Sequence, residues 1–229
     1  MIYYAIGDIH GRDDLLEKMY ARIGADRWLR HSGEECTIVH VGDYIDGGPN
    51  SRAVLDLLMR GVDSFKSIHL LGNHEAMMLA CLETDDRQVW LNWLNNGGDA
   101  TLNSFGVSFR FGGYEPHMLI EVLGVERISW LNALKPYHRT DEYLFVHAGI
   151  VPGRPLAQQK TKDMLWIRGR FLRSEQDHGY VVVHGHTPTE QPVLRSNRIG
   201  IDTGAKTGGE LAAVVLGSTA PRFISVTSN

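Results

Sequence analysis

The chain has 229 residues, and its 43% hydrophobic and 22% charged residues are typical of a globular protein, which excludes a disordered, collagen-like or coiled-coil chain. Its 23 lysines and arginines against 27 aspartates and glutamates give a net charge of -4, so a nucleic-acid partner is not expected. Because no segment reaches the roughly 18 apolar residues of a membrane span, we expect no membrane partner, a cytoplasmic location and a single domain over residues 1–229.

Short apolar segments predict β-strands buried on both faces, because most are nearly continuous in apolar residues and several end in a turn that contains glycine or histidine. In chain order they are Ile2–Ile6, Thr37–Val41, Ile68–Leu71, Tyr143–Val146, Tyr180–Val183, Ile199–Ile201, Leu211–Leu216 and Arg222–Val226.

Helices are predicted between the early strands. Asp13–Arg30 has apolar residues near one face, and Ser51–Arg60 begins with a capping-type serine. Glu75–Leu82 and Val89–Leu94 are further helices, and a cap or loop region is expected around residues 84–140, with Leu94–Tyr114 as a long loop or helical cap. The tryptophans expected to pack in the core or cap are Trp28, Trp90, Trp93 and Trp130. Alternating strands and helices followed by strands predict an α/β fold.

Residues able to carry chemistry gather in the turns after the predicted strands. They are Asp8 and His10, Asp43 and Asp46, Asn73 and His74, His147, and His184 and His186. Each group alone could be a helix cap or a structural histidine. In open α/β sheets, however, ligands bind beyond the carboxyl ends of the strands, so together these groups predict one site at one rim.

The candidate ligands at this rim are carboxylate, amide and imidazole groups without a thiolate. Such a set suits Mn²⁺, Fe or Zn²⁺ rather than a structural thiolate zinc site. It exceeds the needs of one tetrahedral ion and is sufficient for two ions that share a carboxylate. We therefore predict two divalent metal ions, with Mn²⁺ as the first choice, in an arrangement that can clamp a phosphoryl group and deprotonate a water.

Five sequence blocks resemble the ordered signature of the calcineurin-like metallophosphoesterases, and in particular the bacterial and phage serine/threonine phosphatases of the phosphoprotein phosphatase family. They are GDIHG at 7–11, GDYID at 42–46, GNHE at 72–75, HAG at 147–149 and HGHTP at 184–188. The tail IDTGAKTGGELAAVVL is similar to that family as well. The resemblance implies a fold of two mixed β-sheets sandwiched between helices.

The resemblance also implies roles for individual residues. Asp8 and His10 would bind the first metal, Asp43 would bridge both ions, and the second metal would be bound by Asn73, His147 and His184. His74 would protonate the leaving group, with Asp46 orienting it, and Arg168 would clamp the phosphate. His186 is not assigned as a ligand.

One position departs from the family pattern. The pattern G-D-x-[VI]-D-R-G is read here as GDYIDGG, with Gly47 in place of the expected phosphate-binding arginine. Arg52, at the start of the next predicted helix, could fill that space. If it does not, an arginine at position 47 should improve phosphate binding.

The activity that the resemblance implies is hydrolysis of phosphoserine and phosphothreonine in a phosphoprotein or phosphopeptide, by direct attack of a metal-bridging hydroxide. One alternative is a symmetrical diadenosine tetraphosphate hydrolase, which shares the same blocks. A second is a weakly active metal-binding pseudophosphatase, suggested by Gly47 alone. The HGHTP block and the L-W-x-R block at Leu165–Arg168 favour the protein phosphatase.

Overall fold

The computed structural model describes residues 1–108, 115–217 and 219–228. It contains two five-stranded sheets, with strand orders β10-β9-β1-β2-β3 and β4-β5-β6-β8-β7. The first sheet comprises β1 (Ile2–Ile6), β2 (Cys36–His40), β3 (Lys66–His69), β9 (Leu211–Leu216) and β10 (Arg222–Val226). The second comprises β4 (Tyr137–Arg139), β5 (Tyr143–Val146), β6 (Val181–His184), β7 (Val193–Leu194) and β8 (Arg198–Gly200).

Both sheets are mixed, as the resemblance implied. In the first, β1, β2 and β3 are parallel, and β9 and β10 complete it in antiparallel pairing. In the second, β5, β6 and β8 are parallel, while β4 and β7 are antiparallel edges. The short edge strands β4 and β7 were not predicted from the sequence. The bounds of the other eight strands agree with the predicted bounds to within two residues.

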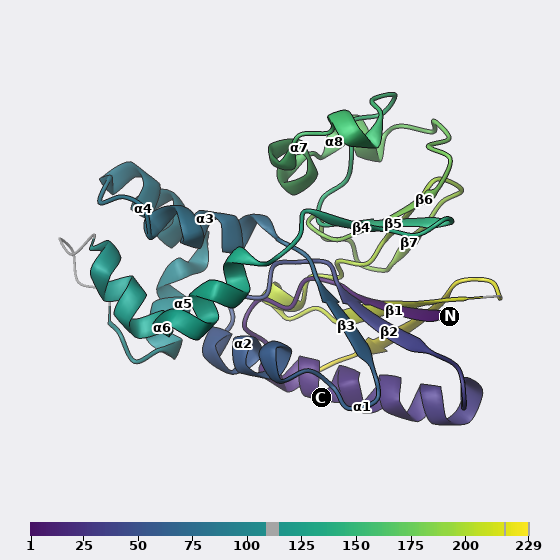
Figure 1. Cartoon of the computed structure of the whole chain (residues 1–229), viewed down its shortest axis with the longest axis horizontal. Coiled ribbons are helices and arrows are strands. Elements are labelled where there is room, and N and C mark those ends of the chain that lie inside the picture. The colour runs from purple at the N-terminus through teal and green to yellow at the C-terminus, as the bar shows by residue number, and fades with distance from the viewer. Residues whose placement is uncertain (109–114, 218, 229) are drawn as a thin grey trace.

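The two sheets pack against each other through apolar side chains, and helices cover the outer faces (Figure 1). Successive side chains of a strand point to opposite faces. Thus Tyr4 and Ile6 of β1 belong to the cluster under the helices, whereas Ala5 belongs to the cluster between the sheets. Burial on both faces explains why the strands are apolar almost throughout.

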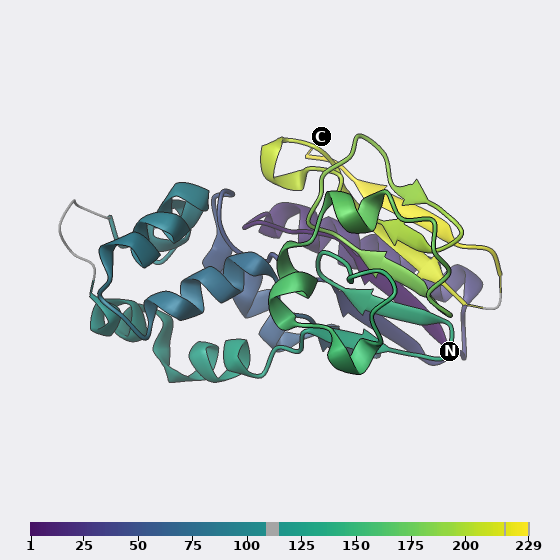
Figure 2. The ribbon, with the colours of Figure 1, turned by 90° about the horizontal axis from the view of Figure 1, so that it is seen from above.

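The helices are arranged on both sides of this sandwich. α1 (Asp13–Arg30) and α2 (Ser51–Arg60) lie under the first sheet, and α7 (Thr161–Trp166) and α8 (Gly169–Leu172) lie over the second (Figure 1). A helical lobe projects to one side (Figure 2). It contains α3 (Asn73–Cys81), α4 (Arg87–Trp93), a π-helical turn at Leu94–Gly98, α5 (Asp99–Ser104) and α6 (Pro116–Asn132).

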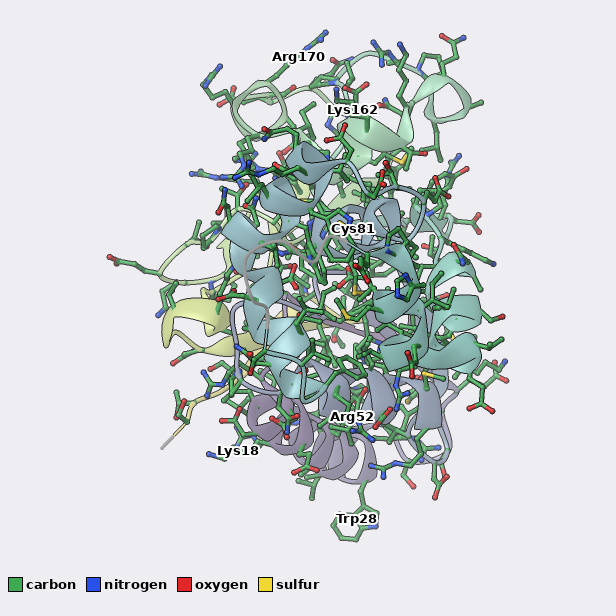
Figure 3. The ribbon with its side chains drawn as sticks, turned by 90° about the vertical axis from the view of Figure 1, so that its left-hand side faces the viewer. Lys18, Trp28, Arg52, Cys81, Lys162 and Arg170 are labelled. Carbon is green, nitrogen blue, oxygen red and sulfur yellow. The ribbon has the colours of Figure 1, made fainter. Side chains whose placement is uncertain are left out.

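Residues 94–104, expected to be a long loop or helical cap, are helical, and residues 109–114 of that stretch lie outside the described residues. Trp90 and Trp93 are buried in this lobe, as expected. Trp28 is not in the core as expected: it is 77% exposed and projects from the end of α1 (Figure 3). No helix in the described part of the chain is long and apolar enough to cross a membrane.

Asp26 ties α1 to the first sheet. Its Oδ2 accepts hydrogen bonds from the Tyr4 hydroxyl (3.0 Å) and from the Arg222 guanidinium (2.7 Å), so three elements meet at one carboxylate. Burial raises the pKa of Asp26, but the hydrogen bonds from Arg222 and Tyr4 outweigh burial and leave the pKa below its ordinary value.

Replacing Asp26 by asparagine should lower the free energy of unfolding by about 1–3 kcal/mol at pH 7, because charge-assisted hydrogen bonds are lost. A carboxylate whose pKa is lower in the folded state stabilises above its unfolded pKa, near 4, and this stabilisation is lost as the pH falls. The difference from wild type should therefore shrink in urea unfolding at pH 3. Glu17→Gln, an exposed change on the same helix, is the control, and equal stability of Asp26→Asn and wild type at pH 7 would contradict this role.

Candidate active site

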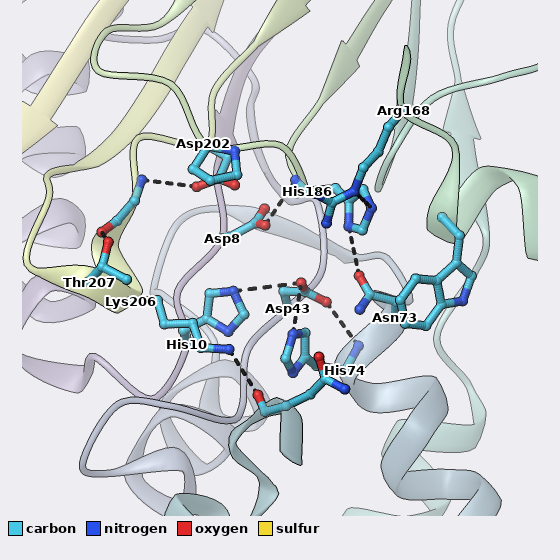
Figure 4. A pocket seen from close by; sticks show the side chains of 14 residues that line it. Asp8, His10, Asp43, Asn73, His74, Arg168, His186, Asp202, Lys206 and Thr207 are labelled. Atoms are coloured by element: carbon cyan, nitrogen blue, oxygen red, sulfur yellow. Dashed lines mark hydrogen bonds and ion pairs between the residues drawn. The ribbon is translucent and has the colours of Figure 1, made fainter. Parts of the chain in front are cut away.

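A cavity of about 220 Å³ lies at the carboxyl ends of the parallel strands of both sheets (Figure 4). The predicted site residues that line it are Asp8, His10, Asp43, Asn73, His74 and Arg168. His186, Asp202 and Lys206 line it as well, although sequence reasoning assigned them no role. Side chains from five strand ends therefore meet at one rim.

The turns at this rim have an unusual backbone. His10, Asp43, Asp46 and His186 have φ values of 49°, 54°, 74° and 65°, in the left-handed region that residues with a side chain rarely adopt. Such conformations concentrate at functional sites, where the surrounding structure holds them. Gly42 is required for a different reason: a Cβ there would lie 2.7 Å from Cα of Gly72. The second and third turns thus touch backbone to backbone.

The buried carboxylate of Glu75 joins these two turns. Its oxygens accept four backbone N–H groups, from Gly72 (3.1 Å), Asp43 (2.9 Å), Tyr44 (2.8 Å) and Ile45 (3.3 Å). Burial raises the pKa of Glu75 to about 7, and the nearby charge of Asp43 acts in the same direction, while the backbone donors favour the ionised form. Glu75 is part of the GNHE block, but sequence reasoning gave it no role.

His10, Asp43 and His74 form a group whose potential ligand atoms lie within 4.8 Å of one another. The Nδ1 atom of His10 lies 3.0 Å from the carbonyl oxygen of Ile45. That carbonyl can only accept, so Nδ1 carries the proton and the lone pair of Nε2 faces Asp43 Oδ2 at 3.6 Å. A lone pair directed at a carboxylate is the arrangement expected of two ligands of one cation.

Asp8 adds a second observation that fits a cation here. Its Oδ2 accepts the backbone N–H of His186 at 2.9 Å, but its buried Oδ1 has no hydrogen-bond partner among the described residues. Burial raises the pKa of Asp8 well above its ordinary value, and Asp202 and Asp43 add to that effect. An unpaired buried carboxylate oxygen is costly unless a cation or a donor compensates it.

Asp43, His147 and His186 form a second group within 4.8 Å. The oxygen of Asn73 lies 2.8 Å from both His147 Nε2 and His186 Nδ1. His147 Nδ1 faces the Val41 carbonyl at 3.1 Å, so a neutral His147 would point its Nε2 lone pair at the Asn73 oxygen. A proton or another cation on Nε2, or the Asn73 NH₂ group in place of its oxygen, makes that contact favourable. Burial lowers the pKa of His147, but the charge of Asp43 outweighs burial and raises it.

The structure does not place His184 with these candidate ligands. His184 is the last residue of β6; its ring packs edge-to-face on Phe171 at 5.1 Å, and it does not line the cavity. The left-handed turn at His186 instead directs that histidine to Asn73. The geometry therefore favours His186 over His184 as the candidate ligand from the HGH block, although Nε2 of His184 is also buried without a hydrogen-bond partner among the described residues.

His74 and Asp46 form a hydrogen-bonded pair at the edge of the cavity, with His74 Nδ1 2.7 Å from Asp46 Oδ2. Asp46 is held in turn by the Trp93 indole N–H and the Thr101 hydroxyl, two residues that sequence reasoning did not assign to the site. Burial lowers the pKa of His74, but the carboxylates of Asp43 and Asp46 outweigh burial and raise it. Both carboxylates therefore favour the protonated form of the ring.

The two arginines expected at the site lie in different places. Arg168 lines the cavity, and its Nε donates to His186 Nε2 at 3.1 Å. Arg52 is exposed on α2, lies 6.0 Å from the ring centre of Phe105, and does not line the cavity (Figure 3). The structure therefore does not bring Arg52 to the space beside Gly47.

Comparisons with known proteins identify the family and the fold of the chain. Residues 1–213 match the sequence model of the calcineurin-like phosphoesterases. The chain is 31% identical over 218 residues to serine/threonine-protein phosphatase 1 of Salmonella typhimurium, covering 91% of this chain and 88% of the relative. It is 26% identical over 286 residues to a symmetrical bis(5'-nucleosyl)-tetraphosphatase of Acidovorax ebreus, covering 96% and 93%. The crystal structure of a provisionally assigned diadenosine tetraphosphatase shares the fold, with a TM-score of 0.68, 21% identity, and coverage of 100% of this chain and 95% of that chain.

Replacing Glu75 by glutamine should lower the free energy of unfolding by about 2–3 kcal/mol, because an amide places an NH₂ group among backbone donors that need an acceptor. Since the same bonds position Asp43, the variant should also bind Mn²⁺ more weakly. Urea unfolding and Mn²⁺ titration measure the two effects. Glu83→Gln, an exposed change just after α3, is the control, and a Glu75→Gln variant as stable as wild type would show that the turns do not need this carboxylate.

Proposed function

Because the chain belongs to the calcineurin-like phosphoesterases, we propose that it is a metal-dependent phosphatase that hydrolyses phosphoserine and phosphothreonine in proteins. The observation that carries the proposal is the His74–Asp46 pair, which stands 2.7 Å apart beside the two groups of candidate metal ligands. The similarity to a serine/threonine-protein phosphatase at 31% identity supports the substrate class.

The residues fit two divalent ions that share Asp43. Asp8, His10 and Asp43 would hold one ion, and Asp43, Asn73, His147 and His186 the other, with His186 replacing His184 in the proposed set. The oxygen and imidazole donors suit Mn²⁺ first, with Fe or Zn²⁺ as alternatives. When bound, such a pair supplies positive charge for phosphoryl oxygens and activates a water for attack on phosphorus.

The protein's own groups complete the reaction. Arg168 holds phosphate oxygens through its planar guanidinium. As the bond between phosphorus and the serine or threonine oxygen breaks, the protonated His74 transfers its Nε2 proton to that oxygen, and the alcohol leaves. Asp46 holds His74 in place through Nδ1 and stabilises its charged form. Trp166, 40% exposed at the rim, offers an apolar surface to the protein chain around the phosphorylated residue.

A second candidate is the hydrolysis of symmetrical dinucleoside tetraphosphates, which the 26% identical relative favours. That alignment extends over 286 residues, more than the 229 of this chain, so the relative contains residues that this chain lacks. The phosphatase alignment extends over only 218. The proton-donor pair and the candidate ligands are all present, which argues against an inactive binding protein.

The substrate class is tested with the Mn²⁺-loaded protein on phosphoserine and phosphothreonine peptides and on diadenosine tetraphosphate. We expect a kcat/KM for the phosphopeptides at least tenfold above that for the dinucleotide. The opposite order would replace the proposed function with the second candidate, and no turnover of any phosphate ester would reject both.

Replacing His74 by asparagine should lower kcat for phosphoserine peptides by roughly 10²–10⁴-fold, the range for loss of a general acid. The loss should be much smaller for aryl phosphates, whose leaving groups need less protonation. Metal content, measured on the same samples, should be unchanged. An equal loss for alkyl and aryl esters would indicate that His74 acts on the metals or the phosphate rather than on the leaving group.

A further inference from the structure

The space beside Gly47 is filled by the side chain of Lys206. A Cβ at Gly47 would lie 2.4 Å from Cε and 2.9 Å from Cγ of Lys206, closer than real Cβ atoms approach. Lys206 belongs to a short 3₁₀ turn, Ala205–Thr207, that follows β8 and is distant in sequence from position 47. A cation therefore occupies the region where the family pattern would put an arginine.

The ammonium group of Lys206 is anchored at the cavity. Its Nζ donates to the carbonyl oxygen of Asn96 at 2.9 Å, and both residues line the cavity (Figure 4). Asn96 belongs to the π-helical turn, which also bonds to the GDYID turn through Gly47 N–H and Gly97 O at 3.1 Å. In the described part of the chain this bond uses one of three ammonium hydrogens, which leaves two for a ligand in the cavity.

Lys206 and Arg168 approach the cavity from different directions (Figure 4). Among the described residues that line it, these two carry the permanent positive charges. Between them lie the carboxylates of Asp8 and Asp43.

We propose that Lys206 is a second phosphate-binding residue, which contacts the oxygens of the substrate phosphate from the side opposite Arg168. It would replace the phosphate-binding arginine that the family pattern has at position 47. The inference rests on the proposed function because it requires a phosphate ester in the cavity. A lysine ammonium is a compact point charge, whereas an arginine binds two oxygens at once in a fixed plane.

The same contact argues against the expectation that an arginine at position 47 would improve phosphate binding. Gly47 has a φ of 83°, and any side chain there meets Lys206. That φ lies in the left-handed region, so a side chain at position 47 would also strain the backbone. Gly47→Arg therefore meets both backbone strain and steric conflict with Lys206.

The test uses the Mn²⁺-loaded protein and inorganic phosphate, measured by calorimetric titration and as a competitive inhibitor of aryl phosphate hydrolysis. Lys206→Met should raise the Kd of phosphate roughly tenfold or more, the scale of one charge-assisted hydrogen bond. Lys206→Arg should stay within about threefold of wild type. Lys66→Met, at the start of β3 and away from the rim, is the control and should leave the Kd unchanged. An unchanged Kd of phosphate in Lys206→Met would overturn the proposal. If that variant also had a lower melting temperature, the contact between Lys206 and Asn96 would have a structural role only.

A second set of variants tests the shared space directly. Gly47→Arg should bind phosphate more weakly than wild type, and Gly47→Arg with Lys206→Ala should bind it more tightly than either single variant. If the double variant loses phosphate affinity by the product of the two single losses, the side chains at positions 47 and 206 do not compete for one space. Because inorganic phosphate is the probe, these titrations decide the role of Lys206 even if the phosphopeptides prove not to be substrates, which would reject the proposed function alone.

Discussion

The carboxylate of Glu75 is the constraint on which the site depends. It gathers backbone N–H groups from two turns that are separated by about thirty residues of chain, and at the same place the glycines 42 and 72 touch. Backbone donors buried without water need such an acceptor. With these turns fixed, Asp43, Asp46 and His74 have one mutual arrangement, and the second sheet adds His147 and His186 to it.

The site also concentrates opposing charges. Buried carboxylates repel one another, and the neutral forms of His10 and His147 direct lone pairs at oxygen atoms, so cations would stabilise the cluster. The positive side chains of Arg168 and Lys206 lie at its rim, where they can meet a phosphate without occupying the centre. In the proposed function, the metals would lie at the centre and the remaining oxygens of the substrate at the rim.

Much of this arrangement could be predicted from local sequence. Strands buried on both faces are apolar throughout, and their polar ends mark the site. The choice between His184 and His186 could not be predicted, since it depends on a left-handed turn and on Phe171, which packs against His184. The edges β4 and β7 depend on neighbouring strands rather than on their own short, polar sequences. Lys206 reaches Gly47 only through tertiary structure.

The left-handed backbone of the turns bears on how such a protein can change during evolution. Asparagine is, after glycine, among the residues that adopt this conformation most readily. At Asp43 and Asp46, a single exchange of aspartate for asparagine therefore removes a charge without straining the backbone, although at position 46 the amide would face the donors Trp93 and Thr101. β-branched residues at the same positions would instead disturb the fold. The backbone of these two turns therefore restricts which residues can replace the aspartates more narrowly than the chemistry of their side chains alone would.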